Sequence, residues 1–306
     1  MIVSCGDAII DMMPGPVPGG SNMNVAVAAA RLGAPTAFLG RVSFDPFGEL
    51  LMEHMEESGV NTTLVERGPE PTARAVVSLH PSPSFQFEAD GTAEANLTIA
   101  DLSPIGQGPH IVHGGTFGMY RGQTAATLAE LIETNPGLIS LDPNVRPSIV
   151  DDRAEWDSWH QRWLDQTSLY RCSDEDAEWI APNRTIDSFA AELLARGIET
   201  VIVTRGGQGC DVFTSAWSEH RNGVQVDVVD TVGAGDTFTG AVLSGLHELG
   251  ATSRSSLSSL DKASLLGVMD NALLASAFVC GRTGANPPWR SELRDWPNRF
   301  EGARAR

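Results

Sequence analysis

The segment at residues 230–238, which reads Asp-Thr-Val-Gly-Ala-Gly-Asp-Thr-Phe, carries residue types that could bind an anion and move a proton. It follows a β-type run at 224–229 and opens a pattern of apolar residues at helical spacing. Gly233 and Gly235 would let a ligand approach the backbone closely, and the amide N–H groups at a helix start attract negative charge. Asp236 could accept a proton from an attacking hydroxyl or could cap the helix, and local chemistry leaves both functions open.

Glycine, aspartate and asparagine also gather after four other predicted strands. In an open α/β sheet, ligands bind beyond the carboxyl ends of the strands, so these residues would meet at one edge. Any one of the segments could be an ordinary turn, for which the same residue types are common. Four of them together favour a binding site. The segments are 11–24, 113–116, 142–146 and 204–209.

The charge of the chain limits what such a site could bind and how. Its 306 residues include 21 basic and 39 acidic side chains, a formal charge of −18, and Lys262 is the only lysine. A phosphate-binding loop ending in Gly-Lys, a protein-kinase catalytic lysine and a Schiff-base lysine are therefore excluded. Nucleic acid and anionic membranes are poor partners for so acidic a chain. An anionic ligand must be held by backbone dipoles, metal ions or arginines, of which Arg146 and Arg205 lie on the predicted edge.

The cysteine and hydropathy patterns indicate a cytoplasmic protein. Four scattered cysteines form no Cys-x-x-Cys pair, which argues against disulfides and a zinc site. His110 and His113 fall in a predicted strand, where their spacing places them on opposite faces and not around a metal. The N-terminus carries Asp7 and Asp11 and lacks the basic region of a secretory signal. The longest uncharged apolar stretch, at about 272–280, is far shorter than the ~18 residues that a membrane span needs.

Segments of β character alternate with helical segments and must position the residues described above. This alternation predicts a mainly parallel sheet covered by helices on both faces. The strands are expected at 2–10, 36–42, 110–113, 138–142 and 199–204, and the helices at 22–32, 46–58, 123–133, 152–166, 185–196, 234–249 and 261–280. The Pro/Gly-rich segment 12–20 and the Ser-rich segment 252–259 are expected to be loops.

One stretch, at residues 72–87, breaks the alternation. It reads as a strand, a Pro-Ser-Pro turn at 81–83 and a second strand that ends at Phe87. A hairpin that leaves the sheet could cover the site as a flap, or it could be an extra edge hairpin, and the residues alone favour neither.

Two signatures, taken together and in this order, resemble those of the ribokinase-like or PfkB carbohydrate kinases. The 230–238 segment is similar to their C-terminal signature, and Gly-Gly-Ser-Asn-Met-Asn at 19–24 with Asp-Pro-Phe-Gly at 45–48 is similar to their N-terminal one. The resemblance extends from residue 5 to residue 288. It implies a ribokinase-like three-layer α/β/α sandwich: one domain over residues 1–306, with a small β lid inserted at about 72–90.

Within this family the chain is most similar to fructokinases. The similar segments are 6–11, 87–94, 142–146 and 282–288, several of which the 2-keto-3-deoxygluconate kinases share. The resemblance implies ATP-dependent phosphorylation of a sugar hydroxyl, most closely a primary hydroxyl of fructose. The alternatives are a 2-keto-3-deoxygluconate kinase, a ribokinase, a nucleoside kinase, or a kinase-fold protein that binds ligand without catalysis. A sugar-acid substrate would require an extra cation near the lid, for which Arg74 is the candidate.

The resemblance also assigns roles at the sugar and phosphoryl sites. It implies that Asp236 is the general base and that the amides of Gly233, Ala234 and Gly235 form a glycine-rich anion hole. This is coherent physically, because phosphoryl transfer depends on positioning and charge stabilisation. The residues matching positions that hold the sugar are Asp11, Gly20, Asn24 and Arg146. A structural salt bridge is the alternative role for the arginine.

The nucleotide and metal sites follow from the same resemblance, which implies Mg-ATP and a monovalent cation such as K⁺. The matching nucleotide-side residues are Thr204, Gly206 and Gly209, with Asn271 and Ala275 on the helix that forms the wall of the adenine pocket. Helix packing would explain the alanine equally well. Asp230 and the carbonyl of Val232 match the monovalent-cation site, and Asp176 matches a residue that contacts magnesium through water.

Two departures from the family pattern stand out. The usual Asn-x-x-Glu motif is replaced by Ser-Asp-Glu-Asp at 173–176, so Asp176 is one methylene shorter than the usual glutamate. The segment between Asp11 and Gly19 is short, which predicts a lid reduced to the 72–87 hairpin. A reduced lid puts in doubt both the shielding of the site and the lid-mediated homodimer of some relatives.

Overall fold

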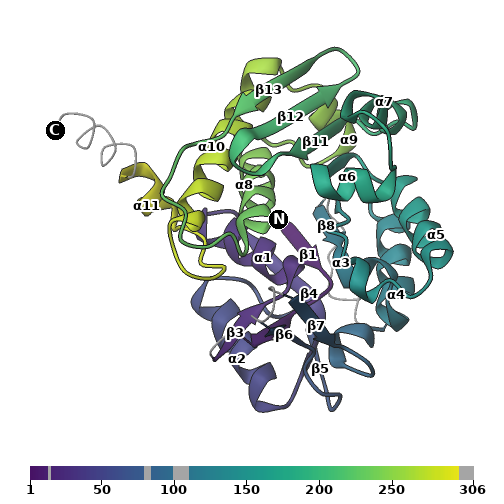
Figure 1. The fold of residues 1–306 in the computed structure, drawn as a ribbon, viewed down its shortest axis with the longest axis vertical. Coiled ribbons are helices and arrows are strands. Elements are labelled where there is room, and N and C mark those ends of the chain that lie inside the picture. The colour runs from purple at the N-terminus through teal and green to yellow at the C-terminus, as the bar shows by residue number, and fades with distance from the viewer. Residues whose placement is uncertain (13–14, 79–83, 99–109, 296–306) are drawn as a thin grey trace.

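Two β-sheets of different size organise the chain in the computed structural model, which describes residues 1–12, 15–78, 84–98 and 110–295 (Figure 1). Within these ranges, the larger sheet has nine strands in the order β13-β12-β11-β10-β9-β8-β1-β4-β5. Neighbouring strands are parallel except for the antiparallel β11–β12 and β12–β13 pairs. The strands are β1 (Ile2–Cys5), β4 (Thr36–Ser43), β5 (Val65–Gly68), β8 (Ile111–Gly115), β9 (Leu138–Asp142), β10 (Leu169–Ser173), β11 (Thr200–Thr204), β12 (Gly209–Thr214) and β13 (Ser218–Asn222).

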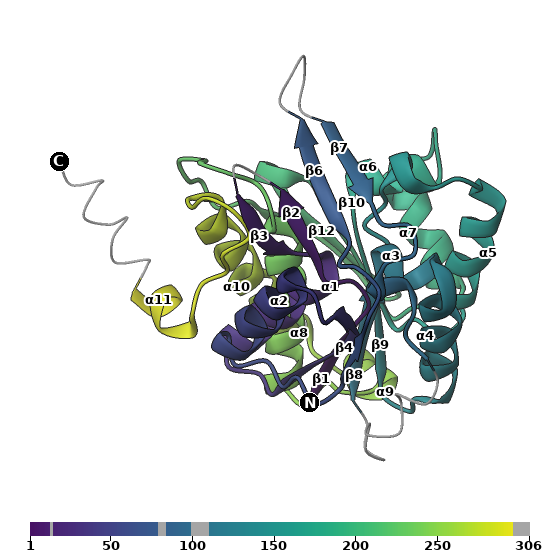
Figure 2. The ribbon, with the colours of Figure 1, turned by 90° about the horizontal axis from the view of Figure 1, so that it is seen from below.

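Buried side chains alternate between the two faces of this sheet, which explains why helices cover both. Ile2 joins the apolar cluster under one helical layer, while Val3 joins the cluster under the other, and Ile111 and Val112 repeat the pattern. Figure 2 shows the two layers on opposite sides of the sheet. One layer contains α1 (Ser21–Arg31), α8 (Ala234–Glu248) and α10 (Lys262–Cys280), and the other contains α4 (Gly122–Thr134), α5 (Arg153–Leu164) and α7 (Ile186–Ala195). The predicted three-layer α/β/α sandwich is confirmed.

The described residues form further helices outside these two groups. They are α2 (Pro46–Glu57), α3 (Thr116–Tyr120), α6 (Asp174–Ile180), α9 (Arg254–Ser258) and α11 (Arg290–Asp295), with 3₁₀ turns at η1 (Ala93–Ala95), η3 (Pro147–Ile149) and η4 (Gly206–Gln208). The Ser-rich segment was expected to be a loop, but it contains α9. Ser253 and Ser256 form a reciprocal capping box that starts this helix.

The smaller sheet is the lid, and it is larger than the sequence predicts. Its strands, in spatial order, are β3 (Pro16–Gly19), β2 (Ile9–Met12), β6 (Arg74–Ser78) and β7 (Ser84–Glu88). The expected reduction to a single hairpin is therefore wrong, and the doubt it cast on a lid-mediated homodimer loses its basis. Figure 2 shows β6 and β7 projecting away from the main sheet. The predicted Pro-Ser-Pro turn at 81–83 lies outside the described residues.

The missing lid strands come from a run that the sequence presents as one strand. The segment 2–10 divides at Gly6, whose φ of +134° turns the chain, so β1 enters the main sheet and β2 the lid. A Cβ at this position would lie 2.6 Å from Asn22 Nδ2, so a side chain would not fit. The expected loop at 12–20 contains β3, which pairs with β2.

The predicted β-run at 224–229, just before the glycine-rich motif, is irregular. Val228 and Val229 are exposed, and the N–H groups of Val229 and Asp230 both donate to the carbonyl of Cys280 at the end of α10. This stretch is therefore tied to a helix end and does not join the sheet. Sequence patterns also missed β5, β10, β12 and β13.

Helix α10 has the length and apolar composition of a helix that could cross a membrane, with a mean hydropathy of 1.6 over its most apolar window. The stretch expected from the sequence, at 272–280, covers only the uncharged residues at the end of this helix. The whole helix is longer and remains apolar on average, although it contains Lys262 and Asp270. Half of that window is buried, and Met269 and Ala272 belong to the core cluster shared with α8. A core helix meets the same criteria, so this is weak evidence for a membrane span.

Candidate active site

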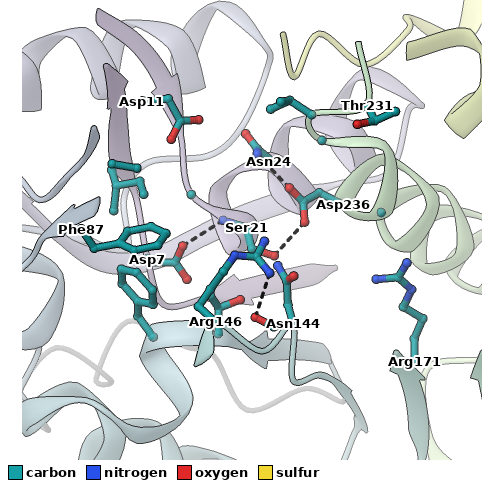
Figure 3. A pocket seen from close by; sticks show the side chains of 18 residues that line it. Asp7, Asp11, Ser21, Asn24, Phe87, Asn144, Arg146, Arg171, Thr231 and Asp236 are labelled. Atoms are coloured by element: carbon teal, nitrogen blue, oxygen red, sulfur yellow. Dashed lines mark hydrogen bonds between the residues drawn. The ribbon is translucent and has the colours of Figure 1, made fainter. Parts of the chain in front are cut away.

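A cavity of about 300 Å³ lies between the lid and the carboxyl edge of the main sheet (Figure 3). It brings together predicted site residues that are far apart in the sequence: Asp11, Gly20, Asn24, Arg146, Gly233, Gly235 and Asp236. The carboxyl ends of parallel strands meet at one edge of a sheet, which places Arg146, after β9, at the cavity. Asp11 enters the cavity from lid strand β2. Ala234, the remaining member of the predicted anion hole, lines a second cavity on the other side of the same helix start.

Asp236 lies in the first turn of α8, and its carboxylate contacts side chains from α1. Its Oδ1 accepts a hydrogen bond from Ser21 Oγ at 2.7 Å, and its Oδ2 accepts one from Asn24 Nδ2 at 2.8 Å. The helix N-cap is Gly233, in the left-handed conformation, so the aspartate does not serve as the cap. The capping alternative therefore fails, and the carboxylate is held in place at the cavity.

Close packing of α1 against α8 allows these hydrogen bonds to form. A Cβ at Gly240 of α8 would lie only 2.6 Å from the Cβ of Ala28 and 2.8 Å from the carbonyl oxygen of Val25. The glycine therefore lets the two helices approach at this point, one turn beyond Asp236.

Three carboxyl groups share the cavity and affect one another. Desolvation raises the pKa of Asp236, while hydrogen bonds from Asn24 and Ser21 lower it. Desolvation also raises the pKa of Asp7 and of Asp11 to about 6, and the negative charge of Asp236 adds to both shifts. Near neutral pH the cavity therefore carries ionised carboxylates that can accept hydrogen bonds from hydroxyl groups.

Asp7 is a site residue that the sequence interpretation missed. It is buried beside the cavity, where its Oδ2 accepts from the Ser21 N–H at 2.8 Å and its Oδ1 accepts from Asn22 Nδ2 at 2.6 Å. These bonds fix the start of α1. Gly20 allows the approach, because a Cβ there would lie 2.8 Å from the carbonyl oxygen of Asp7. A carboxylate directly after the first strand was the available signal.

Apart from Asp11 of β2, the lid side of the cavity is apolar, and its apolar residues were not predicted as site residues. Phe87 of the lid and Phe117 of α3 meet edge to face with ring centroids 5.3 Å apart. Ile9 and Ala75 complete this wall. Arg74, the candidate cation for a sugar acid, forms an ion pair with Glu88 of the neighbouring lid strand.

The side chains of the two arginines predicted on the site edge point into different cavities. Arg146 is exposed and lines the cavity, and its Nη1 donates to the carbonyls of Asn144 and Val145, so these contacts replace the salt bridge considered as its alternative role. Arg205 follows β11 at this edge, but its side chain pairs with Asp211 in a different cavity. The buried arginine at the site is Arg171 of β10, which was not predicted.

The second cavity, of about 240 Å³, contains the predicted nucleotide-side residues Thr204, Gly206 and Gly209. Gly209 has a φ of +106°, and a Cβ there would lie 1.9 Å from the carbonyl oxygen of Arg221, so only glycine fits. Ser276 Oγ donates to the carbonyl of Ala234 at 3.0 Å and ties this wall to the helix start of the anion hole.

The residues of α10 that form this wall differ from those predicted. Asn271 is exposed and Ala275 is buried in the core cluster. The wall is formed by Leu273, Ser276, Ala277 and Cys280. The helix itself was correctly predicted, but a shift of one or two residues turns a different face toward the cavity.

Asp176, the predicted magnesium contact, accepts three hydrogen bonds with its carboxylate. Its Oδ1 binds the Val145 N–H at 2.8 Å, and its Oδ2 binds the N–H and the hydroxyl of Ser173 at 3.0 and 2.7 Å. It thus caps α6 and holds the loop that carries Arg146. A third cavity, of about 450 Å³, is lined by Asp176 and by its exposed neighbours Asp174 and Glu175.

Asp230, predicted at a monovalent-cation site with Val232, also bonds to backbone amides. Its Oδ1 accepts from the Val232 N–H at 3.0 Å and its Oδ2 accepts from the Gly284 N–H at 2.8 Å. A Cβ at Gly233 would lie 2.5 Å from that of Ala285. These contacts hold the glycine-rich motif against the loop that follows α10.

Comparison with known proteins identifies the class to which this site belongs. Residues 15–292 match the family described as pfkB family carbohydrate kinase. A fructokinase of Rhizobium leguminosarum bv. trifolii is 32% identical over 278 residues, covering 87% of this chain and 85% of that protein. The structure of a Xylella fastidiosa fructokinase with bound ATP has a TM-score of 0.89 at 24% identity, covering 98% of each chain. A Vibrio cholerae O395 fructokinase with bound fructose, ADP and calcium ion has a TM-score of 0.85 at 26% identity, covering 96% of this chain and 98% of that one.

These similarities define the fold as ribokinase-like and the protein class as a sugar kinase. The family match over most of the sequence shows that the chain belongs to the PfkB family of carbohydrate kinases. The resemblance inferred from the two signatures is thereby confirmed.

Proposed function

We propose that the protein transfers the γ-phosphoryl group of ATP to a hydroxyl of fructose, with Asp236 as the general base. The main observation behind this proposal is the position of the Asp236 carboxylate. Hydrogen bonds from α1 hold it at the start of α8, between two cavities. The fructokinase relative supports the substrate, and the neighbours with bound ATP or with fructose and ADP support the pair of ligands.

In the proposed reaction the sugar occupies the cavity below the lid. Asp11, Asn24 and Arg146 offer hydrogen-bonding groups to its hydroxyls, and one hydroxyl faces Asp236. The carboxylate takes the hydroxyl proton as the new oxygen–phosphorus bond forms and the bond to the ADP oxygen breaks. Backbone amides of 233–235 stabilise the charge on the phosphoryl oxygens.

The second cavity suits the nucleotide. Its walls combine apolar side chains, among them Val226, Leu273 and Ala277, with a glycine-rich loop at 206–209. Apolar walls favour an adenine ring, and close backbone approach favours phosphates. The start of α8 separates the two cavities, so the γ-phosphate would meet the sugar hydroxyl there.

The carboxylates present fit a hydrated magnesium ion near the phosphates. Asp174 and Glu175 are the exposed candidates, because Asp176 already accepts hydrogen bonds from the backbone and Ser173. Bound with ATP, magnesium would neutralise charge on the phosphates. A K⁺ ion near Asp230 and the Val232 carbonyl is proposed on the family resemblance.

The charges in the cavity favour a neutral sugar over a sugar acid. Asp7, Asp11 and Asp236 line it and outnumber the two arginines there, Arg146 and Arg171, so a substrate carboxylate would meet net negative charge. Arg74, which could have attracted one, already pairs with Glu88. This favours fructose over 2-keto-3-deoxygluconate.

A screen of ADP release with ATP and magnesium tests the proposal. The acceptors are fructose, ribose, 2-keto-3-deoxygluconate and adenosine, each at the same series of concentrations. We expect the highest kcat/KM with fructose. A higher value for the sugar acid or for the nucleoside would overturn the substrate assignment, and no turnover on any acceptor would favour a binding protein without catalysis.

A further inference from the structure

Arg171 lies where three cavities meet, and the reaction proposed for this site does not yet use its charge. The guanidinium side chain and Gly235 both line the sugar cavity, the nucleotide cavity and the third cavity beside Asp174. Figure 3 shows the side chain rising from its strand toward the start of the helix that carries Asp236. Phosphoryl transfer between the first two cavities would have to pass this junction.

The guanidinium is held rigidly in this position. Its side chain is only 8% exposed, Nη1 donates to Asp142 Oδ2 at 2.6 Å and Nη2 donates to Thr204 Oγ1 at 2.7 Å. Both Nη atoms lie 3.1 Å from the point where a Cβ of Gly235 would stand, so the guanidinium lies directly against the anion hole. Within the described part of the chain, its Nε–H has no acceptor.

The ion pair with Asp142 does not use up the charge of Arg171. The same carboxylate also accepts hydrogen bonds from Thr239 Oγ1 and the Asn144 N–H, each at 3.2 Å, so its negative charge is shared among several donors. The guanidinium has five N–H groups in a planar fork, and two of them make the contacts described above. The remaining N–H groups on the two Nη atoms can bind phosphoryl oxygens, whereas the Nε–H is buried.

We propose that Arg171 is a catalytic residue that contacts the phosphoryl group during its transfer; this inference rests on the proposed kinase function. Charge spreads over the phosphoryl oxygens in the transition state, and a cation already fixed beside them needs no reorganisation. The only lysine, Lys262, pairs with Glu219 at an exposed site and does not supply this cation. Arg146 is exposed and contacts the carbonyls of its own loop.

Turnover of Arg171→Gln tests the proposal. We expect kcat to fall about 10²- to 10³-fold, with KM values for ATP and sugar changed only a few-fold, because the contact forms mainly in the transition state. Arg171→Lys should recover part of the loss. Arg162→Gln is the matched control, because it removes an exposed arginine paired with Glu133, and it should leave kcat unchanged.

Binding of ADP with aluminium fluoride supplies a second readout, since this complex imitates the transferring phosphoryl group. Wild-type protein should bind it more tightly than ADP alone, and Arg171→Gln should lose most of that gain while keeping its affinity for ADP. The measurement requires no particular sugar. A failure of fructose to react would therefore contradict the proposed substrate without deciding the role of Arg171.

The single variant leaves Asp142 buried without its partner and could unfold, so a double variant is included. Asp142→Asn with Arg171→Gln replaces the ion pair by neutral groups of similar shape and should unfold at a temperature closer to that of the wild type. Its kcat should remain low. Recovery of kcat or of aluminium fluoride binding in the double variant would show that Arg171 is only structural and would overturn the proposal.

Discussion

The floor and the lid of the sugar cavity are built in opposite ways. In the floor, Asp7, Asp236 and Arg171 are polar groups, each held by at least two hydrogen bonds from neighbouring elements. In the lid, Phe87 and Ile9 contribute apolar surface that packs in a small cluster with Phe117. Fixed polar groups suit charge stabilisation, and a thin apolar cover suits water exclusion and substrate choice.

This contrast predicts that changes in the floor reduce kcat, whereas changes in the lid raise KM. The floor belongs to α1, α8 and β10 of the main domain, where a displaced carboxylate or cation loses its alignment with the reacting atoms. The lid is a separate four-stranded sheet, and Ile9, Ala75 and Phe87 line the cavity below it and neither of the other two cavities at the start of α8.

The largest effect should come from Asp236→Asn. The amide cannot accept the hydroxyl proton, so kcat should fall about 10³- to 10⁴-fold, while the similar shape preserves the contacts with Ser21 and Asn24. Initial rates at saturating ATP and fructose measure this change. Asp157→Asn removes an exposed carboxylate paired with Arg153 and serves as the control, with unchanged rates. Retention of more than a tenth of the wild-type kcat would exclude the aspartate as the base.

A substitution in the lid, Phe87→Ala, should act mainly on sugar binding. Loss of apolar contact over the cavity should lower kcat/KM for fructose about 10- to 30-fold, chiefly through KM. Steady-state kinetics over a range of fructose concentrations separate the two constants. Phe44→Ala removes an exposed ring and should change neither. A decrease in kcat without a change in KM would contradict the prediction that the lid acts mainly on sugar binding.

Activity should also depend on pH, because the three carboxyl groups of the cavity have raised pKa values. Those of Asp7 and Asp11 are about 6, so these groups gain protons as the pH falls through that value. Protonation of Asp7 and Asp11 removes hydrogen-bond acceptors from the cavity, so kcat/KM should decline below about pH 6, approaching tenfold per pH unit. The decline belongs to the coupled group and not to one residue. A rate profile between pH 5 and 8 that stays flat would contradict this account, provided circular dichroism shows a folded protein throughout.

The smallest effect on activity should come from Glu94→Gln, which instead changes stability. Burial raises the pKa of this carboxyl from 4.5 to about 7. The folded state therefore holds the proton more tightly than the unfolded state, and the free energy of unfolding falls as the pH rises from about 4.5 to about 7. The neutral glutamine avoids this loss, so at pH 8 it should raise the free energy of unfolding by about 3 kcal/mol at most, with little change near pH 4.5.

Urea unfolding at the two pH values measures the difference. Glu130→Gln, at an exposed position on α4, is the control and should change stability at neither pH. Equal stabilisation by Glu94→Gln at both pH values would show that titration of the glutamate is not the cause.

Residues next to glycine-rich strand ends could be predicted from the sequence, because parallel strands bring their carboxyl ends to one edge. Arg146, after β9, and Thr204, at the end of β11, lie at this edge for this reason. Asp11 instead reaches the cavity from lid strand β2, and Asp236 follows an irregular segment. Arg171 could not be predicted in the same way. It lies inside a strand among apolar neighbours, and only the packing of β9, β10 and β11 shows that its partners are Asp142 and Thr204.

Two other errors have equally specific physical causes. The lid was underestimated because residues 2–10 were interpreted as one strand, although Gly6 and Asp7 divide the run into β1 and β2. The adenine wall expected at Asn271 and Ala275 came from the family resemblance, which does not fix which face of α10 lines the cavity: the helix buries Ala275 in the core and turns Ser276 and Ala277 to the cavity.

Direct detection of the products from ATP and fructose tests the central claim, which is transfer to a sugar hydroxyl at Asp236. Phosphorus nuclear magnetic resonance follows ADP, inorganic phosphate and sugar phosphate in one sample. The account predicts one sugar phosphate for each ADP with wild-type protein and neither product at a comparable rate with Asp236→Asn. Release of ADP with inorganic phosphate and without sugar phosphate, or equal sugar phosphate from the variant, would contradict it.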